Sequence, residues 1–144
     1  MRLIIDADAT PNLKELCLLA SKYKVVVKAF CDTSHQIELG DKEVIVVDKH
    51  AQSVDIVLVN YVEKGDIVIT QDYGLALLCL GLGTIVINPN GTEYKDTEMN
   101  ALLAFKHNNE CLRKQGVHIK GPKKRTKDDT HKFLSLVEEV LQRM

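Results

Sequence analysis

Residues 65–82 carry the sequence GDIVITQDYGLALLCLGL, and the succession within this stretch decides the fold. A Gly-Asp turn precedes the run IVIT at 67–70, whose β-branched side chains are typical of a strand that is buried on both faces. Asp72 follows two residues later, and residues 73–82 are almost entirely apolar over the length of a helix. A turn, a buried strand, an acidic residue and a helix make one unit of a parallel α/β sheet.

The same succession recurs along the chain. Residues 2–5 form a short, mostly apolar run that ends at Asp6 and Asp8. Thr10 and Pro11 then predict a helix start, with a hydroxyl cap and proline at the first helical position, and a helix to about residue 22. Further strands are predicted at 24–29, 43–47 and 84–87, a turn at 88–91, and further helices at 51–62, 97–112 and 128–143. This alternation predicts an α/β fold with a doubly wound parallel sheet of about five strands, in the order 3-2-1-4-5.

The composition fits one globular domain, residues 1–144. A chain of 144 residues with 45% hydrophobic side chains can bury a core without disulfide staples. The four cysteines form no C-x-x-C pair and three lie in apolar stretches, so we expect buried thiols in a reducing compartment. Because the sequence has no apolar stretch long enough for a signal peptide or a membrane span, we expect a cytoplasmic protein without a membrane partner.

Charge is unevenly distributed along the chain. The net charge of -1 by itself implies neither a nucleic-acid partner nor a membrane. Residues 113–127 nevertheless contain seven Lys or Arg and no Asp or Glu, whereas the remaining residues carry 12 basic and 20 acidic side chains. In this basic loop Lys123, Lys124 and Arg125 are suited to pair with backbone phosphates; a solvated connector before the last helix is the alternative. Aromatic residues are only 5% of the chain, so nucleic-acid binding should be weakly sequence-specific.

Four aspartates are expected to meet at the carboxyl edge of this sheet. Asp6 and Asp8 follow the first strand, and Asp72 follows the fourth, which would be its neighbour where the strand order reverses. Asp55 shares the apolar side of the predicted helix 51–62, where an unpaired charge is costly. A shared divalent cation would satisfy all four carboxylates, and hard oxygen ligands suit Mg²⁺ or Mn²⁺.

Plainer roles exist for each of these acids. Asp8 and Asp72 are also suited to cap the helices that follow them, and Asp55 to form a salt bridge at the edge of the domain. Asp48 and Asp66 fit turns or caps and are left outside the predicted site. The joint placement of acids from three separated segments favours the metal site.

Uncharged residues and a histidine are expected beside the carboxylates. Thr70 and Gln71 would lie close enough to orient a water molecule or a phosphate oxygen. Ser34 and His35 follow the second strand on the same side of the sheet. His35 is suited to contact phosphate or assist proton transfer, and it is equally suited to be an ordinary surface histidine.

The chain resembles the YaiI/YqxD family of bacterial proteins along essentially its whole length. The matching segments are DADATP at 6–11, SH at 34–35, VD at 47–48 with Asp55 and Asn60, GDIVITQDYGLA at 65–76, and GPKKRT at 121–126. One position departs from the pattern, because the family usually has cysteine where this chain has Thr10, and no thiol role carries over to it. The resemblance implies a PIN-like three-layer sandwich. It also implies that Asp6, Asp55 and Asp72 are metal carboxylates, with Asp8 as a fourth.

Such a site predicts a metal-dependent nuclease or phosphodiesterase that acts on RNA or DNA. One alternative is a module that keeps the fold and binds nucleic acid without cutting it. Another is a phosphatase, because residues 4–10 also resemble the first motif of haloacid-dehalogenase-like enzymes, in which Asp6 would be the nucleophile and Asp8 the acid/base. That scheme also needs a nearby lysine and a late acidic pair, and no Gly-Asp-x-x-x-Asp follows a strand in this sequence.

Overall fold

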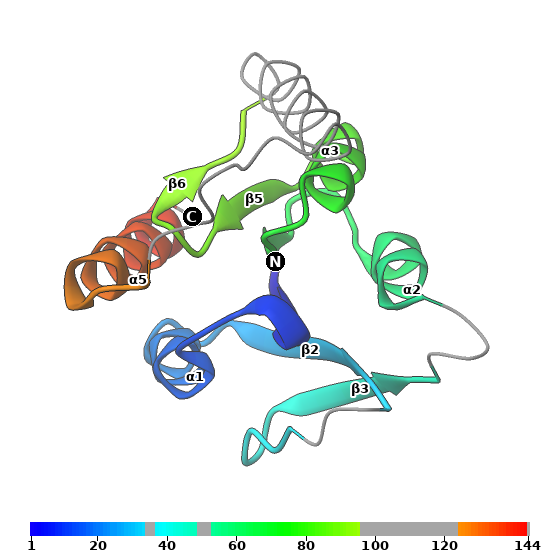
Figure 1. The fold of residues 1–144 in the computed structure, drawn as a ribbon, viewed down its shortest axis with the longest axis horizontal. Coiled ribbons are helices and arrows are strands. Elements are labelled where there is room, and N and C mark those ends of the chain that lie inside the picture. The colour runs from blue at the N-terminus through cyan, green and yellow to red at the C-terminus, as the bar shows by residue number, and fades with distance from the viewer. Residues whose placement is uncertain (34–36, 49–52, 96–123, 144) are drawn as a thin grey trace, which may run out of the picture.

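The computed structural model describes residues 1–33, 37–48, 53–95 and 124–143, and its strands form one sheet (Figure 1). Six strands lie in the order β3-β2-β1-β4-β5-β6, and all neighbours are parallel except the pair β5 and β6. The strands are β1 (Arg2–Asp6), β2 (Val26–Asp32), β3 (Glu43–Val47), β4 (Ile67–Ile69), β5 (Ile85–Asn88) and β6 (Thr92–Glu93). The predicted doubly wound sheet is confirmed, including the reversal of strand order between β1 and β4.

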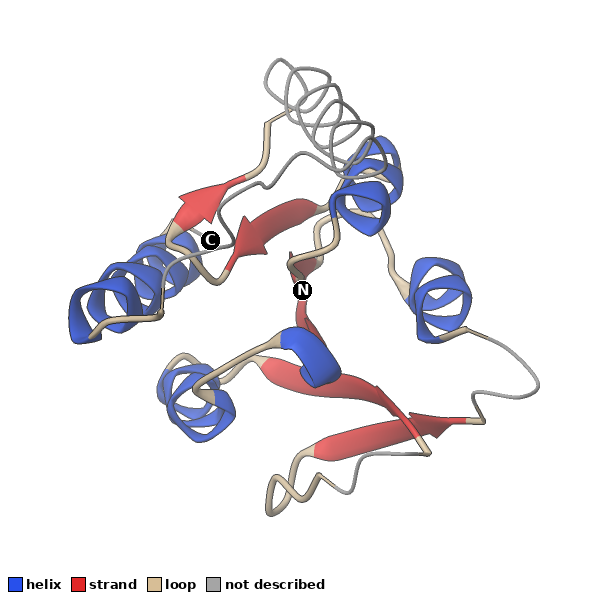
Figure 2. Ribbon diagram, in the orientation of Figure 1, coloured by secondary structure: helices blue, strands red, loops and turns tan. Residues whose placement is uncertain are grey.

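The described helices cover both faces of this sheet (Figure 2). They are α1 (Leu13–Lys22) and α5 (Lys127–Gln142) on one face, and α2 (Val54–Tyr61) and α3 (Tyr73–Gly81) on the other. Successive side chains of a strand point to opposite faces, so Leu3 and Ile5 pack toward α1 and α5 whereas Ile4 packs toward α2 and α3. The result is the three-layer sandwich that the resemblance to PIN-like proteins implies.

The first helix begins later than the sequence predicts. Residues Ala7–Ala9 form a short 3-10 helix, η1, and Thr10 ends it instead of capping α1. The Thr10 hydroxyl donates to the backbone carbonyl of Asp6 at 2.7 Å, and α1 begins three residues beyond Thr10. Helix α1 starts at Leu13 after Asn12, which takes a left-handed conformation with φ 60°. The predicted start at Thr10 and Pro11 was therefore wrong.

Other parts of the fold also differ from the prediction, including the start of α2, which begins at Val54 and not at residue 51. Strand β2 begins two residues late, because Lys24 turns the chain with φ 56°, and it continues to Asp32. The turn at 88–91 leads into β6, an antiparallel strand that the sequence did not indicate. Helix α5 begins at Lys127, where Thr126 and Asp129 form a capping box. The helix predicted at 97–112 lies outside the described residues.

No helix in the described ranges has both the length and the apolar character needed to cross a lipid bilayer.

Candidate functional site

The carboxylate of Asp6 lies at the end of β1 and is buried, with 7% of the residue exposed. The hydroxyl of Thr70, which is fully buried just beyond β4, donates to Asp6 Oδ2 at 3.0 Å. The same hydroxyl accepts a hydrogen bond from the backbone N–H of Asp72, also at 3.0 Å. Thr70 therefore joins the two strand ends at the place where the strand order reverses. This fully buried hydroxyl therefore positions Asp6 and Asp72 relative to each other.

Asp8 and Asp72 are each anchored by a backbone N–H. Asp8, in η1, accepts from the N–H of Asp32 at 3.0 Å, which ties the turn to the end of β2 and differs from a cap on the following helix. Asp72 Oδ1 accepts from the N–H of Leu75 at 3.2 Å and caps α3, which is the plainer role expected for it. The cap uses Oδ1 alone, so Asp72 can cap α3 and still bind a metal ion through its other carboxylate oxygen.

Asp55 approaches the cluster from α2. Burial raises the pKa of this carboxyl group, and so do the negative charge of Asp72 and a hydrogen bond with the Asp72 carboxyl. Burial likewise raises the pKa of Asp6 to about 6, although the Thr70 hydrogen bond opposes the rise. The charges of Asp55, Asp8 and Asp72 raise it further. The four aspartates from β1, η1, α2 and the start of α3 thus act on one another electrostatically, as the sequence suggests.

A second buried aspartate, Asp66, differs from Asp6 because an arginine neutralises its charge. Asp66 is 3% exposed at the other end of β4, and its oxygens accept from the Arg2 guanidinium at 2.7 Å and the backbone N–H of Glu63 at 2.9 Å. Burial raises the pKa of Asp66, but these bonds outweigh burial and the pKa falls below its ordinary value. By contrast, Asp6, Asp55 and Asp72 have no ion pair with any lysine or arginine in the described part of the chain.

The carboxylates do not form a preassembled metal cluster. Among the residues that the structure describes, no three His, Cys, Asp or Glu side chains are arranged to hold a metal ion as they stand. In this arrangement Asp6 accepts a hydrogen bond from Thr70 and Asp72 accepts one from the backbone N–H of Leu75. The structure therefore brings the four acids within electrostatic range and leaves their oxygens short of a coordination shell.

The expected substrate contacts are only partly described. Gln71 is exposed, and its side-chain amide donates to the carbonyl of Ala9 at 2.5 Å. Lys124 is exposed and Arg125 is half-buried. Ser34, His35 and Lys123 lie outside the described residues, as do most of the basic loop at 113–127 and Cys111.

Two residues behind Thr70 were missed in the sequence. The Tyr94 hydroxyl donates to the Thr70 carbonyl at 3.3 Å and accepts from the side chain of Asn88 at 2.7 Å. Burial raises the pKa of Tyr94, so the phenol stays protonated and able to donate. Asn88 had a signal, since it follows an apolar strand directly, as Asp6 does. Tyr94 had none, because only β6 brings it back to β5.

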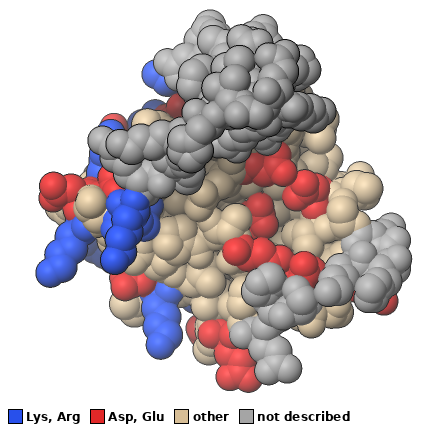
Figure 3. All heavy atoms as spheres, viewed as in Figure 1, with Lys and Arg blue, Asp and Glu red and all other residues tan. Residues whose placement is uncertain are grey.

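Acidic and basic side chains occupy different parts of one face of the molecule. Acidic side chains gather over its middle, whereas lysines and arginines lie toward α5 (Figure 3). Basic side chains beside an acidic region give the face a positive area to which a negatively charged polymer would be attracted.

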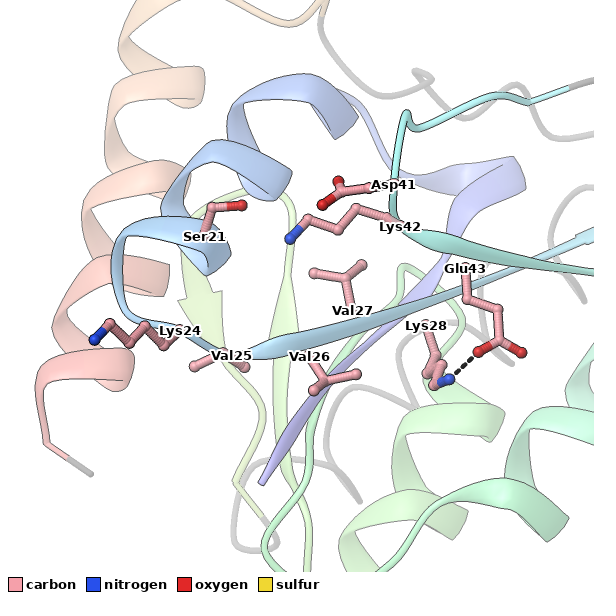
Figure 4. Close-up of a pocket in the computed structure, with 9 residues that line it drawn as sticks. All are labelled: Ser21, Lys24, Val25, Val26, Val27, Lys28, Asp41, Lys42 and Glu43. Carbon is pink, nitrogen blue, oxygen red and sulfur yellow. Dashed lines mark hydrogen bonds and ion pairs between the residues drawn. The ribbon is translucent and has the colours of Figure 1, made fainter.

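A cavity at the other end of the sheet has a different character (Figure 4). It holds about 450 Å³ at the amino-terminal ends of β2 and β3 and is lined by Lys24, Lys42, Asp41 and the ion pair of Lys28 with Glu43. Its charges are of both signs and mostly exposed, so it lacks the buried, single-sign charge of the aspartate cluster. We therefore place the functional site at the carboxyl ends of the strands.

Comparison with known proteins identifies relatives over nearly the full chain. The family model described as "Uncharacterized BCR, YaiI/YqxD family" matches residues 4–143. The chain is 41% identical to a UPF0178 protein of Natranaerobius thermophilus over 145 residues, which cover 100% of this chain and 98% of the relative. It is 43% identical to a UPF0178 protein of Clostridium tetani, with 90% and 88% of the two chains covered. A UPF0178 protein of Ruminiclostridium cellulolyticum is 41% identical, with 92% and 87% covered. No solved structure shows significant similarity to the chain.

Proposed function

The chain belongs to the YaiI/YqxD family, and from its own carboxylates we propose that it is a Mg²⁺- or Mn²⁺-dependent nuclease that hydrolyses phosphodiesters, with RNA as the first candidate and DNA as the second. One observation carries the proposal, namely the difference between its two most buried aspartates. Asp66 has an arginine partner and a lowered pKa, whereas Asp6 has three other carboxylates around it and a pKa of about 6. Folding alone would favour a partner for Asp6 as well, so its uncompensated charge indicates a function.

The donor set fits a hard divalent cation. Asp6, Asp55 and Asp72 would hold the metal ion, with Asp8 as a fourth ligand, and all of them offer carboxylate oxygens. Mutual repulsion among these groups disfavours the ionised state, and a cation among them would relieve it. When bound, Mg²⁺ or Mn²⁺ would lower the pKa of a water molecule and neutralise charge on a scissile phosphate.

The protein's own residues would position the reactants. Thr70 holds Asp6 and the Asp72 backbone together, so it fixes the spacing between β1 and α3. Gln71 is exposed beside them and is suited to donate to a phosphate oxygen, as are Ser34 and His35. Lys123, Lys124 and Arg125 would supply the positive charge that brings a polyanion to an acidic site.

The phosphatase alternative is less well supported. A nucleophilic Asp6 would need a lysine close by, and no lysine in the described ranges forms an ion pair with it. The protein's compartment is also a proposal. The thiols of Cys31 and Cys79 are buried and that of Cys17 is half-buried, which favours a reducing environment such as the cytoplasm.

Cleavage of single-stranded RNA and DNA by the purified protein, with Mg²⁺, Mn²⁺ or EDTA, tests the proposal. We expect metal-dependent cleavage that Asp6→Asn and Asp72→Asn abolish. Asp41→Asn is the matched control, because Asp41 is exposed at the opposite cavity. Absence of cleavage in both metals would contradict the enzyme. Salt-sensitive RNA binding that persists in EDTA and in Asp6→Asn would then support the non-catalytic module instead.

A further inference from the structure

A cleft of about 590 Å³ lies directly beside the aspartate cluster. One wall is the segment from Asp8 to Pro11, and the facing wall is the turn from Asn88 to Asn90 between β5 and β6. Gln71, which precedes Asp72, lies between the two walls, and Arg125 lines the side next to α5. Because Asp8 and Gln71 border both the cluster and the cleft, a ligand in the cleft would be next to whatever the carboxylates act on.

Arg125 is fixed in place at this cleft. Its guanidinium donates through Nη1 to the carbonyl of Pro89 at 2.6 Å and through Nη2 to Asn12 Oδ1 at 3.5 Å, and it lies 5.5 Å from the centre of the Phe133 ring. These contacts come from three separate elements, so the side chain loses little further freedom on binding a ligand.

Arg125 has an acidic neighbour in the cleft, Asp129, whose pKa is lowered by its hydrogen bonds with Thr126 and also by the charge of Arg125. Within the described residues Arg125 forms no ion pair, and its buried Nε has no hydrogen-bond partner. One carboxylate oxygen of Asp129, on α5, accepts a hydrogen bond from the backbone N–H of Thr126 in the capping box. The buried Nε cannot reach a ligand, but Nη1 and Nη2 each carry a second N–H that the contacts with Pro89 and Asn12 do not use, and such a pair of donors suits a phosphate group.

The other walls suit the rest of a nucleotide unit. Pro11 and Pro89 provide apolar surface, and Gln71 and Asn90 provide side-chain amides. None of the described residues that line the cleft is aromatic, so these residues would not hold a base by stacking. The volume is in the range of small-molecule sites and far exceeds a single phosphate.

We propose that this cleft binds the nucleotide next to the scissile phosphodiester and that Arg125 holds its phosphate, so the substrate is a single-stranded polynucleotide and not a phosphomonoester. This inference rests on the proposed nuclease function. Nucleotides in a duplex stay in its stack, whereas a single strand can place one unit in a cleft while the neighbouring phosphate reaches the carboxylates.

Binding of a fluorescein-labelled oligouridylate in EDTA, followed by anisotropy at several salt concentrations, separates this role from general attraction. We expect Arg125→Gln to weaken binding about tenfold and to lower the slope of log K against log salt by about one. Lys24→Gln is the matched control, because it removes the same charge at the opposite cavity and should change neither quantity beyond the screened long-range effect. Arg125→Lys should retain the slope and lose part of the affinity, since it keeps the charge without the planar fork.

Arg125 also packs on Phe133, so a second variant keeps the proposal testable if Arg125→Gln is unstable. Ala9→Phe would fill the cleft from the wall opposite the β5–β6 turn and leave Arg125 in place. It should weaken oligouridylate binding at least as much, because it occupies the volume that the nucleotide would fill. Thermal melts of both variants would confirm folding.

The outcomes also separate this inference from the proposed function. If both variants bind and cleave like the wild type, the cleft has no such role, although the nuclease proposal stands. If the wild type binds through Arg125 but cleaves nothing, the cleft is confirmed as a binding site and the nuclease proposal fails. If the wild type neither binds nor cleaves oligouridylate or its DNA counterpart, both proposals fall.

Discussion

At the scale of single residues, Asp6 and Asp66 have similar burial and opposite electrostatic surroundings. The difference begins with Arg2, which lies in the same strand as Asp6 yet pairs with Asp66. Strands β1 and β4 are parallel with Leu3 opposite Ile67, so Arg2 lies beside Asp66 at their amino ends. Asp6 lies at the carboxyl end of β1, where the neighbouring elements supply aspartates. Arg2 thus neutralises the buried charge of Asp66, whereas Asp6 stays among the other aspartates of the candidate site.

Asp6→Asn should stabilise the metal-free protein above the pKa of Asp6, about 6. A folded pKa raised above the ordinary 3.8 means that the folded state binds the proton more tightly, so the wild type loses stability as the pH rises through this window. The variant escapes that loss, which we expect to be about 3 kcal/mol. Urea unfolding in EDTA across the window measures it, and the two proteins should converge below the lower pKa. A variant less stable than the wild type at every pH would refute the raised pKa.

Asp66→Asn should have the opposite effect. The folded pKa of Asp66 is lowered, so its contribution to stability is present above the ordinary pKa and is lost as the pH falls through the folded value. We expect a loss of about 2–3 kcal/mol near neutral pH, because the variant leaves the partly buried Arg2 without its partner. The same urea series serves for both substitutions. Equal effects of the two variants would mean that the arginine does not distinguish the sites.

At the scale of elements, helix α3 connects the site to the fold through its first turn. Asp72 caps the helix, and Gly74 follows it in the first turn. A Cβ at position 74 would lie 3.3 Å from Asp72 Oδ1, whereas one at Gly81, in the last turn, would meet nothing within 4 Å. An alanine at position 74 would therefore press on the Asp72 carboxylate, whereas an alanine at position 81 of the same helix would not.

Gly74→Ala should weaken Mn²⁺ binding several-fold without unfolding the protein. The added methyl group displaces the Asp72 carboxylate by a few tenths of an ångström, while alanine favours the helix by up to about 1 kcal/mol. Gly81→Ala is the control and should gain similar helix stability with unchanged metal affinity. Calorimetric titration with Mn²⁺ gives the affinity and thermal melting gives the stability. Equal metal affinity in the two variants would argue against Asp72 as a ligand.

At the scale of the whole molecule, the two ends of the sheet have separate roles. The amino ends carry the Arg2–Asp66 pair and a cavity with charges of both signs, which contribute to the fold. The carboxyl ends gather aspartates from three segments, as expected where the strand order of a doubly wound sheet reverses. Stability should therefore respond to a cation only through the carboxyl ends.

Mn²⁺ should raise the Tm of the wild type. A ligand that binds only the folded state adds about 3 kcal/mol at roughly a hundredfold excess over its Kd. The rise should be absent in Asp6→Asn and reduced in Asp55→Asn, and Asp41→Asn should retain it. Differential scanning calorimetry with and without EDTA measures these shifts. A wild-type Tm that is indifferent to Mn²⁺ and Mg²⁺ would exclude the aspartates as a metal site under those conditions.

The sequence by itself determined the order of the elements, the strand order and the acids at the strand ends, because apolar periodicity, β-branched runs and crossover handedness act locally or follow general rules. It also indicated Asp72 as a helix cap. Only the tertiary structure decided that Thr70 joins Asp6 to Asp72, that Thr10 turns back to the Asp6 carbonyl, and that Arg2 neutralises Asp66. The Thr70 and Arg2 contacts each join residues 64 positions apart, and strand register, which neighbours in sequence do not specify, brings them together. The helix start failed for a more local reason, because Ala7–Ala9 form a 3-10 turn and Asn12 takes a left-handed conformation, so that α1 begins only at Leu13.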